Sequence, residues 1–339
     1  MKALVITGKQ KMSIENQKEP VVENNQVLIS PKYIGICGSD IHYFFNGANG
    51  TAVIKEPFVP GHEFSGVLKN DEIINGKKYS AGTSVTIHPA IWGKSLPGIE
   101  NKREIWPGGN YYGSAANFPH CQGGMRELMP VFKEQIRVLP QNVSLKLGSL
   151  AEPLAVALHG ISLAGEIKNK KILVSGAGPI GLLVAASCVL NGANVVVSDV
   201  LNGPLSRAKN LNVDDVINLG AGEKVPSTTF DIVFECSGSA PGITTAFDAV
   251  SLGGTVVQIG MIANKLSSIN LASICTKEAI YKGSLRFDKE FDQAIEMLNN
   301  YKSTFDKVIT HSFSAKDAVK AFEMAKDSQE SGKVVIHFE

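Results

Sequence analysis

The stretch KILVSGAGPIG, residues 171–181, decides how the middle of this sequence folds. The apolar run Lys171–Ser175 is typical of a buried strand and leads directly into a glycine-rich turn. That turn fits the pattern G-x-G-x-x-G, in which glycines allow tight bending and a close backbone approach to a pyrophosphate. The Ala- and Leu-rich run that follows predicts a helix whose first N–H groups are free for phosphate oxygens. The candidate cofactor-binding residues of the turn are Gly176, Gly178, Pro179, Ile180 and Gly181.

An acidic residue, Asp199, ends the next predicted strand. A carboxylate at this place accepts hydrogen bonds from ribose hydroxyls and repels a 2′-phosphate, so the sequence favours NAD over NADP. Arg207, on the following predicted helix, is a counter-signal because it could reach a phosphate, and NADP stays as the alternative. A plain strand–turn–helix without ligand is disfavoured because strand, glycines, helix and acid all occur in register.

Strand-like and helix-like runs alternate on both sides of this turn. Such alternation is typical of a parallel, doubly wound α/β sheet, the Rossmann architecture. The predicted strands are Lys171–Ser175, Asn194–Asp199, Asp231–Glu235 and Gly254–Gly260, and the predicted helices are Leu147–Ala164, Ile180–Asn191, Pro204–Leu211 and Gly242–Val250.

The first 140 residues are instead rich in short strand-like runs separated by Gly and Pro, namely Val27–Ser30, Gly66–Lys69 and Ser84–His88. Two more helices are predicted at Phe287–Asn299 and Ala315–Asp327, before a last strand, Lys333–Phe338. The β character of that strand matches the N-terminal part. We therefore expect a discontinuous catalytic domain of residues 1–148 and 284–339 around a nucleotide-binding domain of residues 149–283.

Composition excludes several classes of function. The net charge of +1 provides no basic field for nucleic acid or an acidic membrane surface. Apolar runs stay below the roughly 18 residues of a membrane-spanning helix. The five cysteines are odd in number, widely spaced and without a C-x-x-C pair. A disulfide framework is therefore not expected, and a cytoplasmic location fits best.

Two short Gly-flanked motifs carry metal-binding chemistry: GICGSDIH, residues 35–42, and GHEFSG, residues 61–66. Cys37 and His62 with an acid form a good zinc set, and a catalytic zinc keeps one position open. The acid is Glu63 or Glu152, the latter at the expected junction of the two domains, where clefts tend to lie. Each residue has a structural alternative: a buried thiol, a packed imidazole, or an acid that favours a helix N-terminus.

The expected chemistry explains this choice of residues. Zinc polarises a substrate hydroxyl, and a nicotinamide accepts the hydride. Ser39 and His42 lie close enough to Cys37 along the chain to carry the released proton outward. Asp40 is suited to orienting a ligand.

Taken together, GICGSDIH, GHEFSG, AEPLAVALH (residues 151–159) and GAGPIG resemble the zinc-containing medium-chain dehydrogenases over the whole chain. Two segments, YGSAANFPHCQGG (residues 112–124) and KGSLRFD (residues 282–288), resemble the sorbitol (polyol) dehydrogenase branch and most of all the L-idonate 5-dehydrogenases.

The resemblance implies a GroES-like catalytic domain, a Rossmann domain and an active site between them. It implies Cys37 and His62 as zinc ligands, with Glu63 or Glu152 as the third. It also implies that Tyr43, Phe118 and Arg286 line the polyol pocket. The forked donors of an arginine suit several hydroxyls or a carboxylate, although a surface arginine is the alternative. A homodimer or homotetramer is expected, with strand Gly254–Gly260 as the sheet edge that joins subunits.

One departure concerns a second, structural zinc that many relatives bind through four cysteines. The corresponding positions here are Gly93, Leu96, Ile99 and Pro107, so we expect one catalytic zinc and no structural site. The lobe must hold itself by packing, through Trp92, Ile99 and Trp106, and we expect it to be mobile or reshaped.

The sequence thus predicts a zinc-dependent enzyme that transfers a hydride from a secondary hydroxyl of a sugar acid or polyol to NAD(P). A sorbitol- or xylitol-type dehydrogenase is the first alternative. A zinc-free quinone reductase-like protein and a non-catalytic nucleotide-binding protein are less favoured, because both motifs with metal-binding residues are present.

Overall fold

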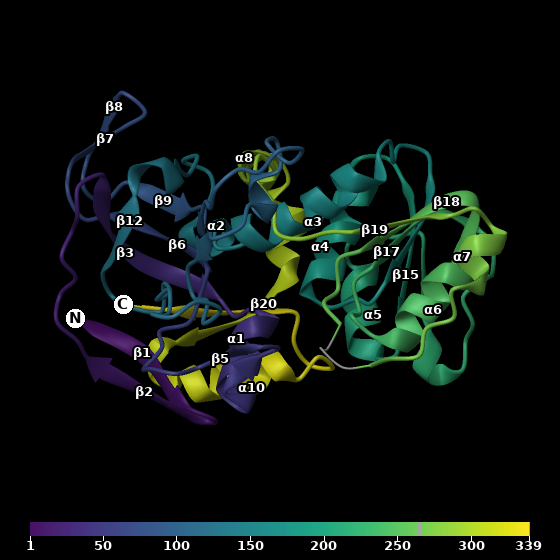
Figure 1. Ribbon diagram of the computed structural model, residues 1–339, viewed down its shortest axis with the longest axis horizontal. Coiled ribbons are helices and arrows are strands. Elements are labelled where there is room, and N and C mark those ends of the chain that lie inside the picture. Colours follow the sequence, from purple (N-terminus) through teal and green to yellow (C-terminus); the bar gives the residue numbers. More distant parts are fainter. Residues whose placement is uncertain (263–265, 339) are drawn as a thin grey trace.

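The computed structural model describes residues 1–262 and 266–338. It shows two parts side by side, a β-rich part that contains both chain ends and an α/β part built from the middle of the chain (Figure 1). This is the predicted combination of a β-rich unit and a doubly wound, parallel α/β unit. In the described ranges, no helix is both long and apolar enough to span a membrane.

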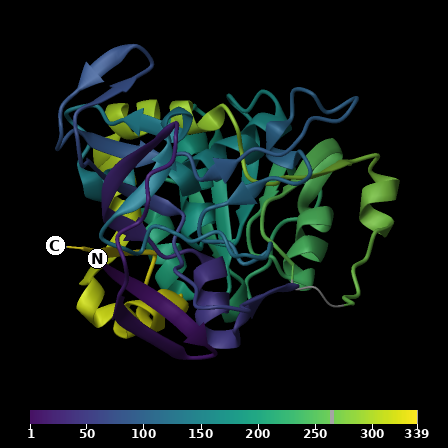
Figure 2. The same ribbon diagram turned by 60° about the vertical axis from the view of Figure 1, so that its left-hand side comes forward.

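The β-rich part is organised around a seven-stranded sheet in the order β13-β9-β6-β3-β21-β20, with β12 also paired to β3. Its strands are β3 (Gln26–Gly35), β6 (Glu63–Leu68), β9 (Ser84–Ile87), β12 (Met129–Phe132), β13 (Ile136–Val138), β20 (Ile309–Ser314) and β21 (Lys333–His337). The last strand, β21, pairs antiparallel with β3, so residues from near both chain ends meet in one sheet. The hairpin of β7 (Glu72–Ile74) and β8 (Lys77–Tyr79) projects from this part (Figure 2).

The α/β part is a six-stranded parallel sheet in the order β16-β15-β14-β17-β18-β19. Its strands are β14 (Lys171–Ser175), β15 (Asn194–Asp199), β16 (Asp215–Asn218), β17 (Phe230–Glu235), β18 (Val250–Gln258) and β19 (Ile280–Gly283). The helices that alternate with them are α4 (Pro179–Leu190), α5 (Asn202–Lys209), α6 (Ala240–Ala249) and α7 (Ala272–Thr276). The predicted alternation, with β14 and β15 at their predicted bounds, is confirmed.

One prediction about this sheet is wrong. Strand Gly254–Gly260 was expected at the edge, but β18 lies between β17 and β19, and β19 forms the edge. The sequence does not predict a strand at Ile280–Gly283, because its side chains are half-buried or exposed and show no apolar alternation. The edge strand β16 is missed for the same reason, since no residue in it is fully buried.

The helix predicted over Leu147–Ala164 is two helices, α2 (Leu145–Gly148) and α3 (Ala151–Ala164). Pro153 has no N–H to donate to the carbonyl of residue 149. The helical hydrogen-bond pattern is therefore interrupted, and the two helices separate between Gly148 and Ala151. The break matters for function because it places Glu152 in the first turn of α3.

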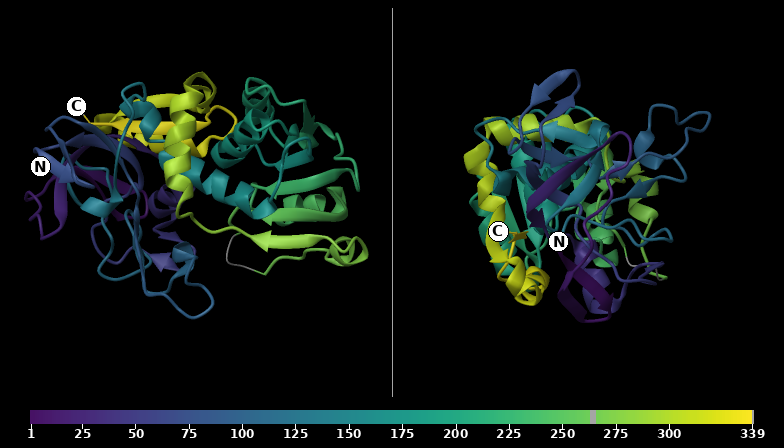
Figure 3. Two further views of the ribbon diagram at one scale, coloured as in Figure 1. Left: turned by 90° about the horizontal axis from the view of Figure 1, so that it is seen from above. Right: turned by 90° about the vertical axis from the view of Figure 1, so that its left-hand side faces the viewer.

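The C-terminal helices return the chain to the β-rich part. Helix α8 (Glu290–Asn300) packs on α3 and α2, and it stands between the two parts in the left view of Figure 3. Helix α10 (Ala318–Lys326) follows β20 and packs on helix α1 (Gly38–Asn46). The domain boundaries expected from the sequence stay predictions.

Candidate active site

A buried carboxylate holds the two metal-binding motifs together. Cys37 is the N-cap of α1, and Asp40 lies in the first turn of that helix. Asp40 Oδ2 accepts the N–H of Cys37 at 3.0 Å, and its Oδ1 accepts the N–H of Gly61 at 3.1 Å. Burial raises the pKa of Asp40, whereas His62 opposes the rise. The contacts fix the backbone on both sides of the candidate ligands, a positioning role for Asp40.

Cys37, His62 and Glu63 bring one ligand atom each to within 4.8 Å of one another, and they are the one cluster of this kind that the described residues form. His62 and Glu63 are buried. Burial lowers the pKa of His62, but Cys37, Glu152 and Asp40 outweigh burial and raise it well above 6.5. The buried Nδ1 of His62 has no partner in the described part of the chain. The surroundings therefore favour a positive charge at this point, as a cation would supply.

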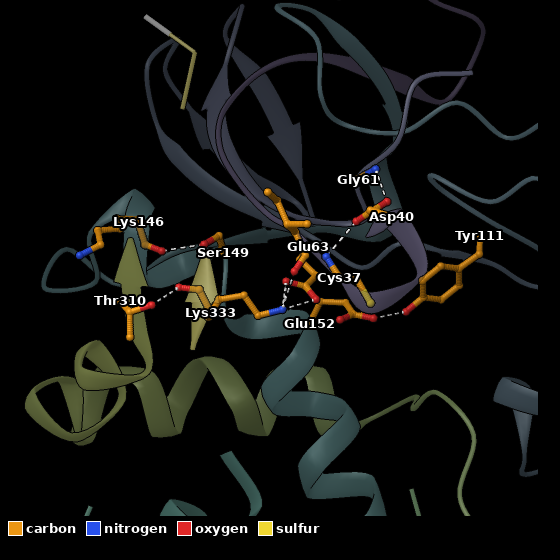
Figure 4. A network of polar contacts seen from close by, with 11 residues as sticks. Cys37, Asp40, Gly61, Glu63, Tyr111, Lys146, Ser149, Glu152, Thr310 and Lys333 are labelled. Carbon is orange, nitrogen blue, oxygen red and sulfur yellow. Dashed lines mark hydrogen bonds and ion pairs between the residues drawn. The ribbon is translucent and has the colours of Figure 1, made fainter. Parts of the chain in front are cut away.

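A buried ion pair holds Glu63 in place. The ammonium of Lys333 lies 2.7 Å from both carboxylate oxygens of Glu63 and 3.2 Å from the carbonyl oxygen of Ile36 (Figure 4). Burial lowers the pKa of Lys333, but Glu63 and Cys37 raise it above its usual value. Gly35 leaves the space, because a Cβ there would lie 2.1 Å from Glu63 Oε2.

Glu152 lies beside this cluster and has a different partner. Its Oε1 accepts a hydrogen bond from the hydroxyl of Tyr111 at 2.7 Å (Figure 4). Burial raises the pKa of Glu152 to about 7, and His62 works against the rise. The carboxyl group is thus an acid or base that can change its protonation near neutral pH.

Tyr111, in strand β11 (Asn110–Tyr111), was missed by the sequence analysis. Its ring meets His62 edge-on at 5.5 Å between centroids, and the guanidinium of Arg286 lies 4.5 Å from its centre. One aromatic side chain therefore touches a candidate metal ligand, a candidate acid–base group and a candidate substrate-binding arginine. The only signal in the sequence was a pair of tyrosines in a long Gly-rich stretch.

Ser39 and His42 lie three residues apart on α1. The buried hydroxyl of Ser39 has no partner in the described residues. His42 is exposed, with its Nδ1 at 3.2 Å from the side-chain amide of Asn46. The helix therefore leads from the buried cluster to solvent, and the proton relay stays a prediction.

The other two predicted pocket residues lie at opposite ends of a chain of rings. Tyr43 is buried, packs edge-on against Phe58 at 5.0 Å and accepts the N–H of Ala115 at 3.0 Å. Phe58 contacts His120, which in turn contacts Phe118. Phe118 is 65% exposed. The structure thus places Tyr43 as a packed side chain and Phe118 at the surface, and their pocket roles stay predictions.

The glycine-rich turn lines a cavity of about 390 Å³ between α4 and α6. Residues of the segment before β21 form another part of its wall. Asp199 lies in its wall and accepts the N–H groups of Ala177 at 2.7 Å and Leu201 at 3.0 Å. Gly181 lets α4 pack on the turn, since a Cβ would lie 1.9 Å from the Gly176 carbonyl oxygen. The predicted residues that line the cavity are Gly176, Gly178, Pro179 and Asp199, whereas Ile180 is half-buried in α4.

Arg207, the residue that keeps NADP as the alternative, already has hydrogen-bond partners within the protein. Its guanidinium donates to the carbonyl oxygens of Ser328 at 2.5 Å and Gln329 at 3.1 Å. Burial also lowers its pKa. These contacts hold the side chain against the C-terminal segment.

Side-chain contacts hold the lobe that lacks cysteines. The indole N–H of Trp106 donates to the carbonyl oxygen of Ile99 at 2.8 Å. The guanidinium of Arg103 lies 4.8 Å from the centre of the Trp92 ring. The predicted residues Trp92, Ile99 and Trp106 are therefore in place, joined by Arg103, which was not predicted.

Comparison with known proteins now identifies the family. An alcohol dehydrogenase GroES-like domain matches residues 23–141, and a zinc-binding dehydrogenase domain matches residues 179–300. The chain belongs to the zinc-dependent alcohol dehydrogenase family. As a member it is an oxidoreductase, and its cluster suits the metal: thiolate, imidazole and carboxylate are all zinc ligands.

By their names, two relatives of this family member act on a keto sugar, D-xylulose, and on a sugar acid, L-idonate. It is 33% identical to D-xylulose reductase of Saccharomyces cerevisiae, over 95% of this chain and 93% of the relative. It is 32% identical to L-idonate 5-dehydrogenase (NAD(P)(+)) of Escherichia coli, over 98% of both chains. The crystal structure of L-idonate 5-dehydrogenase from Escherichia coli superposes with a TM-score of 0.91, covering 99% of this chain and 98% of that one, at 30% identity.

Proposed function

We propose that this enzyme transfers a hydride from a secondary hydroxyl of a sugar acid to NAD, as an L-idonate 5-dehydrogenase-like enzyme. The proposal rests on two contacts of Tyr111: the guanidinium of Arg286 lies over its ring, and its hydroxyl donates a hydrogen bond to Glu152. This line of three side chains lies beside the cluster of Cys37, His62 and Glu63. The arginine offers a fork that suits a carboxylate. The other end of the line offers acid–base chemistry at a hydroxyl.

Cys37, His62 and Glu63 would hold the catalytic zinc. Bound there, zinc would polarise the substrate oxygen, and NAD in the glycine-lined cavity would supply the hydride acceptor. We favour Glu63 as the third ligand because its carboxylate, and not that of Glu152, lies in the one group of ligand atoms within 4.8 Å of one another that the described residues form. Glu152 then orients the hydroxyl, and Ser39 and His42 carry its proton outward.

The NAD preference rests on Asp199 in the cavity wall and on the hydrogen bonds that occupy Arg207. Asp199 is positioned by the N–H groups of Ala177 and Leu201 with its charge at the expected ribose site. Arg207 is occupied by backbone carbonyls and is not offered to a 2′-phosphate.

We also propose that the enzyme is a homodimer or homotetramer joined through the edge strand β19. The side chains of Ile280 and Tyr281 in this strand are 49% and 44% exposed, and Leu285 just beyond is 47% exposed. An uncovered apolar sheet edge is a site for pairing with another chain.

A sorbitol- or xylitol-type dehydrogenase is the second candidate. Its support is the 31% identity to sorbitol dehydrogenase of Bos taurus over 96% of this chain and 92% of the relative. A zinc-free reductase lacks support because the cluster keeps all its ligand side chains.

Turnover measurements test these proposals. The purified, zinc-loaded protein is offered L-idonate, other aldonates, sorbitol and xylitol with NAD or NADP, and reduced cofactor is followed by absorbance. The proposal expects the highest kcat/KM with an aldonate and NAD. Preference for a neutral polyol would favour the second candidate, and activity that survives chelation would contradict both.

A further inference from the structure

The link between β19 and α8 is held by segment 88–111, which contains the lobe without cysteines. Three consecutive residues of this link, Arg286, Phe287 and Asp288, each contact a different residue of segment 88–111. Arg286 lies over Tyr111, Phe287 packs on His88, and Asp288 pairs with Arg103. The partners belong to one continuous stretch of chain, so the lobe and the link are positioned together.

The outermost of these contacts has the most specific geometry. Arg103 donates through Nε to one oxygen of Asp288 at 2.9 Å and through Nη2 to the other at 2.7 Å. The same guanidinium lies over the ring of Trp92. A forked pair fixes direction as well as distance, which a single contact between exposed charges does not.

The middle contact makes the link stiff. Phe287 is 1% exposed, with its ring 4.9 Å from His88 and stacked on Phe291 at 5.6 Å between centroids. A buried aromatic anchor leaves the residues on either side little freedom to rotate independently. We therefore expect a constraint on Asp288 to reach Arg286, two residues away, through the anchored Phe287.

The backbone of Arg286 needs such a constraint. Its φ of 53° lies in the left-handed region, which residues other than glycine rarely adopt. A conformation of this kind persists when the surroundings hold it. Without the Arg103–Asp288 fork, the link could relax toward ordinary backbone angles and carry the Arg286 side chain off the Tyr111 ring.

We propose that Arg103 is a positioning residue for substrate specificity: through Asp288 it holds the Arg286 guanidinium over Tyr111, where that guanidinium receives the carboxylate of the substrate. This inference rests on the proposed function, because it assigns the carboxylate end of the same substrate. It gives the lobe without cysteines a role in substrate binding.

The variants Arg103→Gln and Asp288→Asn test the inference, with Arg137→Gln as the matched control. Arg137 also pairs with an aspartate of the α8 region, Asp292 at 2.6 Å, and its other hydrogen bonds go to the carbonyl oxygens of Glu134 and Ile136, outside the link. KM and kcat are measured for L-idonate and for sorbitol. We expect Arg103→Gln and Asp288→Asn to raise KM for the acid about tenfold, with less than a twofold change for the polyol and in kcat.

The exchange variant Arg103→Asp with Asp288→Arg restores a pair and should recover a large part of the preference for the acid. Equal rises of KM for acid and polyol, or an equal effect in Arg137→Gln, would overturn the inference.

Hydrogen exchange of residues 284–289 separates this inference from the proposed function. We expect faster exchange there in Arg103→Gln than in Arg137→Gln, whatever the substrate is. Unchanged exchange would overturn the inference, whereas a wild-type enzyme inactive on both substrates contradicts the proposed function.

Discussion

Lys333 places its ammonium 2.7 Å from both oxygens of Glu63, and both side chains are almost fully buried. Replacement of one partner leaves the other charge buried without compensation, which typically costs about 3–5 kcal/mol. We therefore expect Lys333→Met to lower the free energy of unfolding of the metal-free protein by that amount. Urea unfolding in the presence of a chelator measures it.

The matched control for this prediction is the double variant Lys333→Met with Glu63→Gln. It removes both charges and keeps a side chain of similar size at each position, so it should recover more than half of the lost stability. A double variant as unstable as Lys333→Met alone would show that packing, not charge, is responsible.

Arg286→Ala should raise KM for an aldonate more than KM for a neutral polyol, by about tenfold or more, because only the acid loses a charged partner. Steady-state kinetics with both substrates check it. Tyr111→Phe is the control: it keeps the ring under Arg286 but removes the hydroxyl that Glu152 accepts. It should lower kcat/KM about tenfold for both substrates alike. An equal loss for acid and polyol in Arg286→Ala would contradict a carboxylate-binding role.

His88 should make the enzyme less stable as the pH falls. Its ring is enclosed by Trp92, Phe287 and Phe291, and burial lowers its pKa to about 4, with a contribution from Arg137. The unfolded chain binds a proton near pH 6.5, whereas the folded chain does not until about pH 4. The stabilisation is therefore complete above pH 6.5 and is lost on acidification, by about 2 kcal/mol between pH 7.5 and 5.

The variant His88→Asn tests this contribution. Its amide oxygen can still accept the N–H of Ala90, which donates to His88 Nδ1 in the structure. The melting temperature, measured by thermal unfolding from pH 7.5 to pH 5, should fall less steeply for the variant than for the wild type. Parallel curves would show that His88 is not the group that titrates.

Asp199→Asn should weaken the discrimination against NADP. Asp199 accepts the N–H groups of Ala177 and Leu201 with different oxygens, so the single amide oxygen of Asn can keep one of these two bonds. The charge that repels a 2′-phosphate is lost. We expect the ratio of kcat/KM for NAD to that for NADP to fall about tenfold. If the ratio stays unchanged, the preference originates elsewhere in the cavity.

The sequence predicted the parts of this molecule that depend on local patterns. The strands beside the glycine-rich turn have strong apolar runs, so β14 and β15 were found at their bounds. Two dense motifs predicted Cys37 and His62 with an acid, Glu63 or Glu152, and the structure groups Glu63 with them. A sequence can also show which residues are absent, and the missing cysteines of the lobe were apparent without coordinates.

The remaining features depend on contacts between distant residues. Lys333 contacts Glu63 across 270 residues, and nothing around it marks a buried lysine. Tyr111 gains its role only because a loop places it beside His62 and Glu152. The edge strand β19 was missed because its side chains are half-exposed, and the interior strand β18 was taken for the edge in its place.

The pairing of β21 with β3 has a consequence for biosynthesis. Lys333 leaves the ribosome after the whole nucleotide-binding part, so Glu63 has no counter-charge until translation is nearly finished. The glycine-rich turn and its parallel strands, in contrast, come from one uninterrupted stretch that can fold while later codons are still being read. A nascent chain of this enzyme should therefore form its parallel sheet and glycine-rich turn first. The cofactor cavity, which Ser328, Ser331 and Gly332 help to line, and the catalytic centre should be completed last, so prematurely terminated products should lack that centre.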